Sequence, residues 1–528
     1  MTEGARRAGT IGVIVAVLLV AAGVDQLVSA PAPRAQVVAV QRTPREVASA
    51  SAISSSWYCA AGLSPTPTAR GTAATTTSTA ATTTTAPAAA TATTKASPLG
   101  STSSTSGRKL RRSAAKKPAA RAPSVSLLLA NSGSHPVRGS VTTVSPSGAR
   151  AAMAITVPAR GQMVVDESRL APGPDTAATV ALDGGAVAVE QRVTTATMGT
   201  AVAPCASRPT RAWYFASGST AGGDRLLVSL YNPLASPAIA DLSFVTGEGQ
   251  LRPSDDQGIV VPGESQVVLD VGAHVQERSL VATTVTVRLG RVVADEVEMG
   301  SARPDLALTL GAAAPRTRWY FPAGLVVPGA HERLDIVNPS ADAAQVEIGL
   351  ALSSGGAEPL HVTVAPGGIL QVEADKQHRI PVGVLFGAVV RSTNGVAVVA
   401  ERSIVDSPPD HQRGLGDTVG GLPARRWLLA AGPPAGSSQV VIVENPGAAP
   451  VRVSVAVLDR GPAGPVPGLS DLVVPPGRPL LLPLGAFLHG SEPQLPLAVT
   501  AGAPIVVEQD VIGPGGRGVS TVLAEPAP

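Results

Sequence analysis

The sequence predicts an all-β protein in which one N-terminal hydrophobic helix precedes four tandem immunoglobulin-like β-sandwich repeats. Three observations lead to this fold class: a recurring tryptophan phrase, further landmarks in constant order behind it, and short Val-rich stretches bounded by turn residues. Self-similarity at a fixed period is the signature of a repeat architecture. A period of roughly 100 residues fits one immunoglobulin-like sandwich.

All four tryptophans of the 528-residue chain open a similar phrase. The phrases are WYCAAG at Trp57, WYFASG at Trp213, WYFPAG at Trp319 and WLLAAG at Trp427, and the last three tryptophans are 106 and 108 residues apart. This spacing sets the predicted boundaries of the repeats, which are residues 57–203, 204–310, 311–418 and 419–528.

Three landmarks follow each tryptophan in the same order. The first is an Asn at the end of an apolar run, followed by Pro in three copies and by Ser132 in the first (Asn131, Asn232, Asn338, Asn445). The second is a Pro-Gly pair, reduced to a Pro in the first copy (Pro158, Pro262, Pro366, Pro476). The third is a Gly with an acid six residues later (Glu190, Glu296, Glu401, Glu508). Proline has no N–H and therefore ends a strand, and Pro-Gly is typical of a type II turn.

The stretches between the landmarks alternate in polarity and are bounded by turn residues, as strands do. Examples are VRVSVAVLD (451–459), TTVTVRLG (283–290) and AQVEIGLAL (344–352). Each repeat holds about seven of them, which favours an immunoglobulin-like sandwich. A four-bladed propeller, with about four strands per repeat, is the weaker alternative. Because 44% of the residues are hydrophobic and only 2% are aromatic, Val, Leu and Ala must build the cores.

The N-terminus predicts export. Residues 1–9 form a short cytoplasmic region with Arg6 and Arg7, residues 10–30 a hydrophobic segment, and residues 31–56 a linker. The apolar run of 14 residues from Ile11 to Val24 is short for a membrane span and typical of a signal-peptide core. Pro31 after the candidate cleavage site, and extension of the helix to Ala30, favour an uncleaved anchor. With Arg6 and Arg7 inside, the repeats lie outside the membrane, either on a single-pass anchor or as a secreted protein after cleavage.

The two cysteines and the insertion in repeat 1 are interpreted together. Cys59 and Cys205 flank this repeat, and an even cysteine count in an exported protein predicts one disulfide, with two unpaired thiols as the alternative. Residues 63–123 form an insertion that begins with a Thr/Ala/Pro tract, predicted to be disordered and either O-glycosylated or a plain linker. The basic stretch 107–121 is a solvated linker or a contact to anionic lipids or wall polymers.

No catalytic, cofactor or metal residues are predicted. The seven histidines lack paired metal-ligand spacing, and the chain has neither a GxSxG elbow nor a phosphate-binding loop. The four repeated acids are the best polar candidates for a shared role, although an outward-facing residue on an alternating strand or a cross-strand charge partner is the simpler explanation. The pairs Trp213–Tyr214 and Trp319–Tyr320 are the candidate ligand-binding residues, by stacking on a sugar, and are otherwise core residues. A net charge of +3 indicates no nucleic-acid partner.

The hydrophobic N-terminal segment, the Thr/Ala-rich tract and the WYxxxG, Asn-Pro and Pro-Gly repeats resemble uncharacterised exported proteins of high-GC Gram-positive bacteria, which are catalogued as a domain of unknown function. The resemblance implies an envelope setting and supplies no catalytic residues. The expected function is a non-enzymatic extracytoplasmic scaffold or interaction protein, with the membrane, wall polymers and other envelope proteins as partners. The alternative is a wall-polysaccharide-binding protein that uses its Trp-Tyr strands, and an enzyme is the least favoured class.

Overall fold

The computed structural model describes residues 45–64, 123–170, 176–300, 305–406, 414–430, 436–458, 466–488, 495–513 and 518–528. These residues form antiparallel β-sheets with five short 3-10 helices and no α-helix, which confirms the all-β prediction. The predicted hydrophobic segment 10–30 and nearly all of the insertion 63–123 lie outside them. Within the described ranges, no helix is long and apolar enough to cross a membrane.

The strands fall into four sheet pairs, each with one tryptophan strand in its "Trp sheet" and one repeated acid in its "acid sheet". In sheet pair 1, the Trp sheet has the order β1 (Ser55–Cys59), β6 (Ala177–Leu182), β3 (Val137–Val144), β4 (Arg150–Val157), and the acid sheet the order β5 (Gly161–Asp166), β2 (Ser124–Asn131), β7 (Val187–Thr195), β8 (Gly199–Pro204). In sheet pair 2, the Trp sheet holds β9 (Ala212–Phe215), β15 (Val281–Leu289), β11 (Ala238–Thr246), β12 (Gly249–Leu251) and β13 (Ile259–Val261), and the acid sheet β14 (Ser265–Asp270), β10 (Arg225–Asn232), β16 (Val293–Met299) and β17 (Leu306–Leu310).

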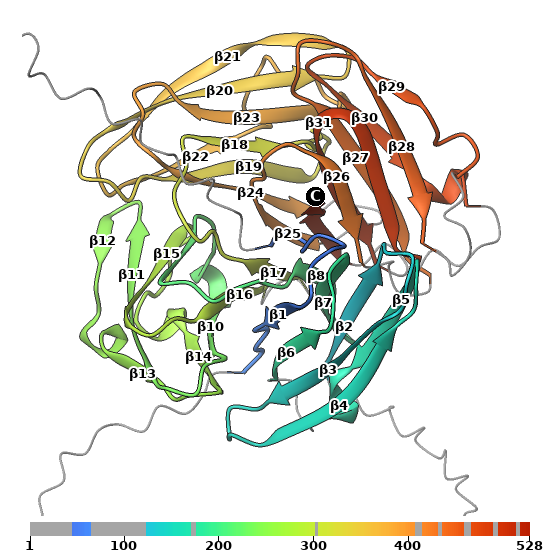
Figure 1. Cartoon of the computed structure of the whole chain (residues 1–528). Helices are drawn as coiled ribbons and strands as arrows, with labels where there is room; N and C mark the ends of the chain where they lie inside the picture. The colour runs from blue at the N-terminus through green and yellow to red at the C-terminus, as the bar shows by residue number, and fades with distance from the viewer. Residues whose placement is uncertain are drawn as a thin grey trace, which may run out of the picture. The chain divides into compact units, whose positions relative to one another are not determined.

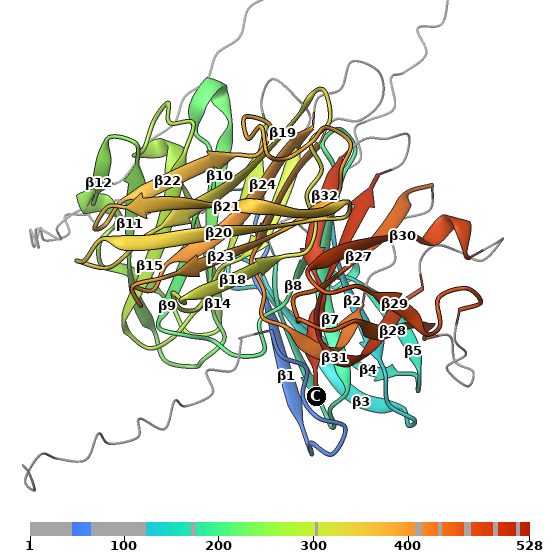
Figure 2. The ribbon, with the colours of Figure 1, turned by 90° about the horizontal axis from the view of Figure 1, so that it is seen from above.

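Sheet pairs 3 and 4 follow the same plan. Sheet pair 3 has β18 (Arg318–Phe321), β23 (Phe386–Ser392), β20 (Ala344–Leu352) and β21 (Gly355–Val364) in the Trp sheet, and β22 (Ile369–Glu373), β19 (Ala330–Val337), β24 (Val399–Asp406) and β25 (Gly414–Val419) in the acid sheet. Figure 2 shows β20, β21 and β23 running alongside one another. In sheet pair 4 the long strand β31 (Leu497–Ile512) joins both sheets. Its first part pairs with β26 (Ala424–Leu429) and β28 (Val451–Val457), its second part with β27 (Ser438–Asn445) and β32 (Val519–Leu523), and β29 (Leu472–Val474), β30 (Arg478–Pro483) and β33 (Glu525–Ala527) complete the edges.

The strand order departs from that of an immunoglobulin sandwich in three pairings, one of which is that of β4 with β3 rather than with β5. Pairing of β2 with β5 and of β3 with β6 matches the central pairings of that fold. However, the first strand β1 pairs with β6, and the seventh strand β7 pairs with β2, whereas the immunoglobulin order has the reverse. The exchange puts β7 and an eighth strand, β8, in one sheet. Both strands are buried on nearly their whole length, because one face covers their own core and the other meets neighbouring sheet pairs.

The hydrophobic cores link the sheet pairs in a cycle. Ala60, which follows the Trp strand of sheet pair 1, lies in the core of sheet pair 2, and Ala216 of sheet pair 2 lies in the core of sheet pair 3. Tyr320 of sheet pair 3 packs in the core of sheet pair 4, and Leu428 of sheet pair 4 in that of sheet pair 1. The eighth strands also meet: β8 contacts β17 and β17 contacts β25, as their labels in Figure 1 show. In addition, β25 contacts β32 and β32 contacts β8. The described residues, from Arg45 onward, thus form one compact unit.

The repeated Asn is a buried clamp between two turns. All four are fully buried, and each side-chain amide donates to a carbonyl four residues ahead and to one at the end of a strand 26 to 29 residues ahead (Asn131, Asn232, Asn338, Asn445). Each side-chain oxygen accepts the N–H two residues on. The Asn therefore satisfies turn groups that would otherwise be buried without partners.

Candidate functional site

The tryptophans are core residues. Their exposed fractions are 1% for Trp57, 0% for Trp213, 3% for Trp319 and 1% for Trp427. In sheet pairs 2, 3 and 4 the indole N–H donates to a main-chain carbonyl at the start of the acid strand: Val292 at 2.8 Å, Val398 at 2.7 Å and Ile505 at 3.1 Å. The rings of Trp213 and Trp319 consequently offer no face on which a sugar can stack.

The tyrosines beside them join each Trp strand to the segment that follows the eighth strand. Tyr58 pairs through its main chain with Ala206, Tyr214 with Ala312, and Tyr320 with Gly421. The side chains of Tyr214 and Tyr320 pack against the hydrophobic cores of the next sheet pairs. The candidate ligand-binding residues Tyr214 and Tyr320 thus lie between sheet pairs and form no open platform.

Cys59 and Cys205 form a disulfide in the structure, with Cα atoms 4.8 Å apart. Cys59 stands two residues after its tryptophan, at the position that Phe215 and Phe321 occupy in sheet pairs 2 and 3. Opposite these rings are Gly311 and Gly420, where a Cβ would come within 2.8 Å and 2.9 Å of the ring Cζ atoms. The disulfide therefore fills, in sheet pair 1, the space that a Phe side chain packed over a Gly fills in the next two.

Strand register identifies which acids are equivalent. Glu190, Asp295, Glu401 and Glu508 each lie opposite the residue three positions before the clamp Asn of their sheet pair. In sheet pair 2 the equivalent residue is thus Asp295, not Glu296, because the connection from Gly290 to the acid is one residue shorter. The interpretation of the predicted acids as outward-facing is wrong, because Glu190, Glu401 and Glu508 are 0% exposed and Glu296 is 6% exposed. Asp295 is likewise 0% exposed. The second face of an acid strand is covered by a neighbouring sheet pair.

Three of the acids accept main-chain N–H groups from the loop after the Trp strand of another sheet pair. Asp295 accepts from Ala60 at 2.8 Å, and Glu190 from Ala430 at 3.1 Å. Glu401 accepts from Ala216 at 2.6 Å and Ser217 at 3.0 Å. We name each contact by the sheet pairs that it joins, so these hydrogen bonds lie at boundaries 1/2, 4/1 and 2/3.

Boundary 3/4 uses an arginine instead. The loop residue equivalent to Ala60 and Ala216 is Pro322, which has no N–H to donate. Arg402, 1% exposed, contacts the carboxylate of Glu508 with one guanidinium nitrogen and the carbonyl of Ala323 with another. The second nitrogen also lies 3.2 Å from Glu332. A guanidinium can serve several acceptors at once, and here it takes over the role of the missing N–H.

The residue after each acid completes the boundary. Gln191 donates to Asp295 across boundary 1/2, and Arg402 reaches Glu508 across boundary 3/4. Gln509 holds the position in sheet pair 4 and accepts from Gln439. In sheet pair 2 the residue directly after the acid is Glu296. Only there does the position carry a carboxyl group rather than a donor.

Burial changes the acid–base properties of these carboxyls. Loss of hydration raises the pKa of Asp295 to about 7, although Gln191 and Ala60 oppose the shift by hydrogen bonding. Burial likewise raises the pKa of Glu401 and of Glu508 well above the ordinary range. Arg402 acts against this at Glu508, since its positive charge favours the carboxylate. The repeated acids are therefore held in an apolar setting by their bonds to the adjacent sheet pair.

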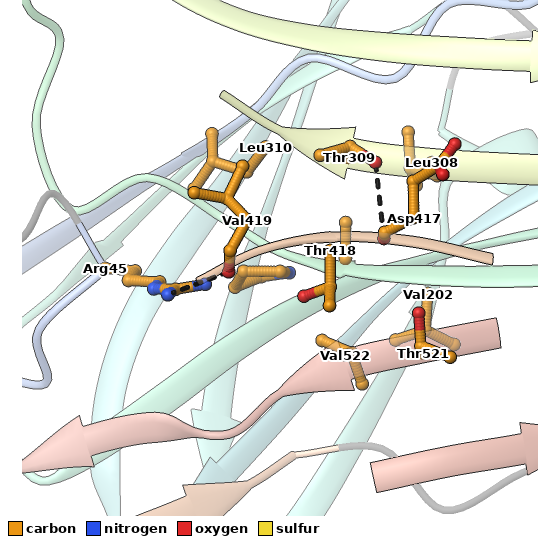
Figure 3. Close-up of a pocket in the computed structure, with 12 residues that line it drawn as sticks. Arg45, Val202, Leu308, Thr309, Leu310, Asp417, Thr418, Val419, Thr521 and Val522 are labelled. Atoms are coloured by element: carbon orange, nitrogen blue, oxygen red, sulfur yellow. Dashed lines mark hydrogen bonds between the residues drawn. The ribbon is translucent and has the colours of Figure 1, made fainter. Parts of the chain in front are cut away.

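A small cavity lies where the eighth strands meet. Residues of β8, β17, β25 and β32 line it together with Arg45, and its volume is about 10 Å³. Figure 3 shows Arg45 beside the main-chain carbonyl of Val419 and the Thr309 hydroxyl beside the main-chain carbonyl of Asp417. Arg45 donates to Val419 at 3.5 Å, and the Thr309 hydroxyl donates to the Asp417 carbonyl at 3.4 Å. Arg45 also donates to Gly420 at 3.1 Å. This volume is at the lower limit for one water and far below the roughly 300 Å³ of a small-molecule site.

The repeated acids form their hydrogen bonds and ion pairs with other protein groups of the neighbouring sheet pairs. Among the residues that the structure describes, no group of three or more His, Cys, Asp and Glu side chains is placed to hold a metal ion. Sequence spacing pointed to the acids but not to their partners, Gln191, Arg402 and the loop N–H groups. One pattern in the sequence could have indicated the loop N–H groups. An alanine stands three positions after the tryptophan in three copies, and Pro322, which has no N–H, stands there in the third copy.

Comparisons with known proteins found one family match and several partial structural likenesses. Thermotoga maritima 1070 is 26% identical over 20% of this chain and 94% of its own, with a TM-score of 0.19. The Anabaena sensory rhodopsin transducer is 25% identical over 17% and 88%, with a TM-score of 0.15. At these TM-scores neither likeness carries an argument. No curated protein matches the chain. Residues 184–417 match the model of a family of unknown function, DUF5719, so a domain of this family spans the acid strands of sheet pairs 1, 2 and 3.

Proposed function

We propose that the protein is a non-enzymatic extracytoplasmic scaffold or interaction protein of the cell envelope, anchored by residues 10–30 and built from four tandem sandwich repeats. The observation that carries this proposal is the use of the repeated polar residues. Glu190, Asp295, Glu401 and Glu508 all bond to another sheet pair. A side chain committed to such a contact is not available to a substrate.

Two further observations support the proposal. The cavity at the eighth strands, about 10 Å³, has no room for an organic substrate. The disulfide between Cys59 and Cys205 suits an oxidising compartment outside the membrane. Arg6 and Arg7 before the apolar run Ile11–Val24 favour the orientation in which the sandwiches are exported.

Location is tested with reporters fused after Pro528. A reporter that works only outside the cell should be active, because the anchor keeps Arg6 and Arg7 inside. A variant with both arginines changed to Glu serves as the control and should lower that activity. Activity of a cytoplasmic reporter alone at this position contradicts the proposed location.

The scaffold role is tested by photo-crosslinking of the full chain in its own membrane. The Trp sheet of sheet pair 2 presents Val260 and Leu289, 55% and 56% exposed, on either side of Ile239. A photoreactive residue at Val260 should crosslink to defined envelope proteins, and the same group at exposed Thr286, in a polar part of the sheet, is the control. If Val260 yields only wall polysaccharide, the polysaccharide-binding function replaces the scaffold.

A further inference from the structure

Boundary 2/3 differs from the others in the residue that follows the repeated acid. At boundary 1/2 this residue is Gln191, whose amide donates to Asp295, and at boundary 3/4 it is Arg402, which contacts Glu508. At boundary 2/3 it is Glu296, and the acid of sheet pair 3 is Glu401. Two carboxyl groups thus hold the places where a donor and an acceptor stand elsewhere.

Both carboxyls are buried and incompletely bonded. Glu296 is 6% exposed and Glu401 is 0% exposed. One oxygen of Glu401 accepts the N–H groups of Ala216 and Ser217, whereas its other oxygen, Oε1, and Oε2 of Glu296 have no hydrogen-bond partner. Without a proton, neither group can donate to the other. The negative charge of Glu401 acts on Glu296, and the joint ionisation of two buried carboxyls at one boundary is disfavoured.

We propose that boundary 2/3 is a pH-dependent latch, closed by a proton bound at Glu296 opposite Glu401 and loosened when that proton leaves. The protonated carboxyl is the chemical counterpart of Gln191, since each supplies one donor at the same position. Loss of the proton leaves like charges between two sheet pairs and removes the donor. Sheet pairs 2 and 3 then separate more easily than sheet pairs 1 and 2. At boundary 1/2 the donor is the amide of Gln191, which does not lose a proton.

The neighbouring carboxyls act in the same direction, and two arginines oppose them. Glu298, two residues further along β16, and Asp417 of β25 add negative charge near Glu296. Asp335 of β19 and Asp417 act on Glu401. The opposing charges are Arg333 of β19, which contacts Asp335 at 3.7 Å, and Arg402 of β24, which is engaged by Glu508. Asp224 adds negative charge near Glu298, and Arg333 opposes it there.

The sign of the pH dependence follows from burial. Burial raises the pKa of Glu296 well above its ordinary value of 4.5, and the charge of Glu401 adds to the shift. The folded protein then binds a proton that the unfolded chain has lost, so stability is complete below pH 4.5 and falls as the pH rises toward the folded pKa. Each proton of this kind changes the unfolding equilibrium constant about tenfold per pH unit within that window.

The test compares the full-length wild type with Glu296→Gln, which supplies the donor present in sheet pairs 1 and 4. At pH 5 the two should unfold at similar temperatures, and at pH 8 to 9 the variant should be the more stable. Hydrogen exchange of the Ala216 and Ser217 amides, compared at one pH, should be slower in Glu296→Gln, while that of Ala60 stays the same. Parallel stability profiles from pH 5 to 9, or unchanged exchange at Ala216, overturn the latch.

Two matched variants make the test reciprocal. Gln191→Glu places a second carboxyl opposite Asp295 and should give boundary 1/2 a new loss of stability at high pH, seen as faster exchange at Ala60. Glu347→Gln changes a partly exposed carboxyl that pairs with Arg391 in a Trp sheet rather than with a repeated acid, and it should leave the profile as in the wild type. If Glu347→Gln flattens the profile as much as Glu296→Gln does, the effect is one of net charge and the latch is contradicted.

Discussion

The clamp asparagines show how much of this fold depends on single side chains. In sheet pair 3, Asn338 donates to Asp342 at 2.7 Å and to Val364 and Ala365 at 3.1 Å each, and it accepts from Ser340. Such a set ties the end of β19 to the turn before β22. The same hydrogen bonds form at Asn131, Asn232 and Asn445, which indicates that each sheet pair needs this Asn to hold its turns.

Asn338→Ala should lower the free energy of unfolding by about 2–4 kcal/mol, because several buried carbonyls lose their donor. Chemical denaturation measures the loss. Asn394→Ala is the matched control, since Asn394 also bonds turn groups but lies exposed, and it should cost much less. Equal losses for the two variants contradict the clamp.

The sequence predicts which single residues recur in every repeat, but it does not predict what those residues contact. The spacing marked the four Asn and the four acids, but it placed the acid of sheet pair 2 at Glu296 instead of Asp295, because a connection one residue shorter is invisible without strand register. The outward-facing interpretation of the acids failed for a related reason. Alternation along a strand tells which residues share a face, and it does not tell whether water or another sheet covers that face.

At the scale of elements, β1 is separated from β2 by the long insertion, whereas β9 and β10 are joined by a short loop. The disulfide from Cys59 to Cys205 links β1 to the residue just after β8. The equivalent elements of sheet pairs 2 and 3 are held by Phe215 over Gly311 and Phe321 over Gly420. The disulfide therefore fixes β1 to its sheet pair at the point where the chain itself connects β1 to β2 only through a long insertion.

Replacement of the cysteine pair by Cys59→Phe with Cys205→Gly separates packing from crosslinking. The double variant should keep the local packing, lose the estimated 4–5 kcal/mol of the crosslink, and unfold at a temperature that reductant does not change. Cys59→Ser with Cys205→Ser should be less stable still, because it also leaves the space poorly filled. A thermal melt with and without reductant measures both, and the same melting temperature for the two double variants contradicts the equivalence.

The elements themselves are largely predictable from the sequence, and their pairing is not. Val451–Asp459 and Ala344–Leu352 alternate as strands should, and the structure has β28 and β20 there. The partner of each edge strand depends on contacts between residues far apart in the chain. Local patterns carry no information about whether β1 pairs with β2 or with β6, which is why the immunoglobulin order was expected.

At the scale of the whole molecule, the sheet pairs are bound to each other through shared cores as well as polar contacts. The N-terminal segment takes part: Val47 donates its N–H to Pro526 at 3.0 Å, and Ala186 donates to Ala48 at 2.9 Å. Arg45 reaches the end of β25. The two ends of the described chain therefore meet beside boundary 4/1, a relation between residues nearly 480 positions apart that no local pattern predicts.

Trp319→Ala should cost about 3–5 kcal/mol, since it empties a large volume in a core that is poor in aromatic residues. Because every sheet pair is held at two boundaries, we expect the loss to lower the melting temperature of the compact unit in one transition. Differential scanning calorimetry distinguishes this from local melting. A separate low-temperature transition that involves only sheet pair 3 contradicts the expected cooperativity.

The contact of β32 with β8 has a consequence for how such a chain can change over time. Linear repeat arrays keep an unpaired interface at each end, so they need capping units and can lengthen by duplication of one unit. Here the first and last sandwiches occupy each other's free interface, so the array has no ends to cap. Adding a fifth unit would require boundary 4/1 to open, and removing one would leave acids such as Glu190 without their donors. A change in the number of units would therefore have to rebuild the contacts at two boundaries at once.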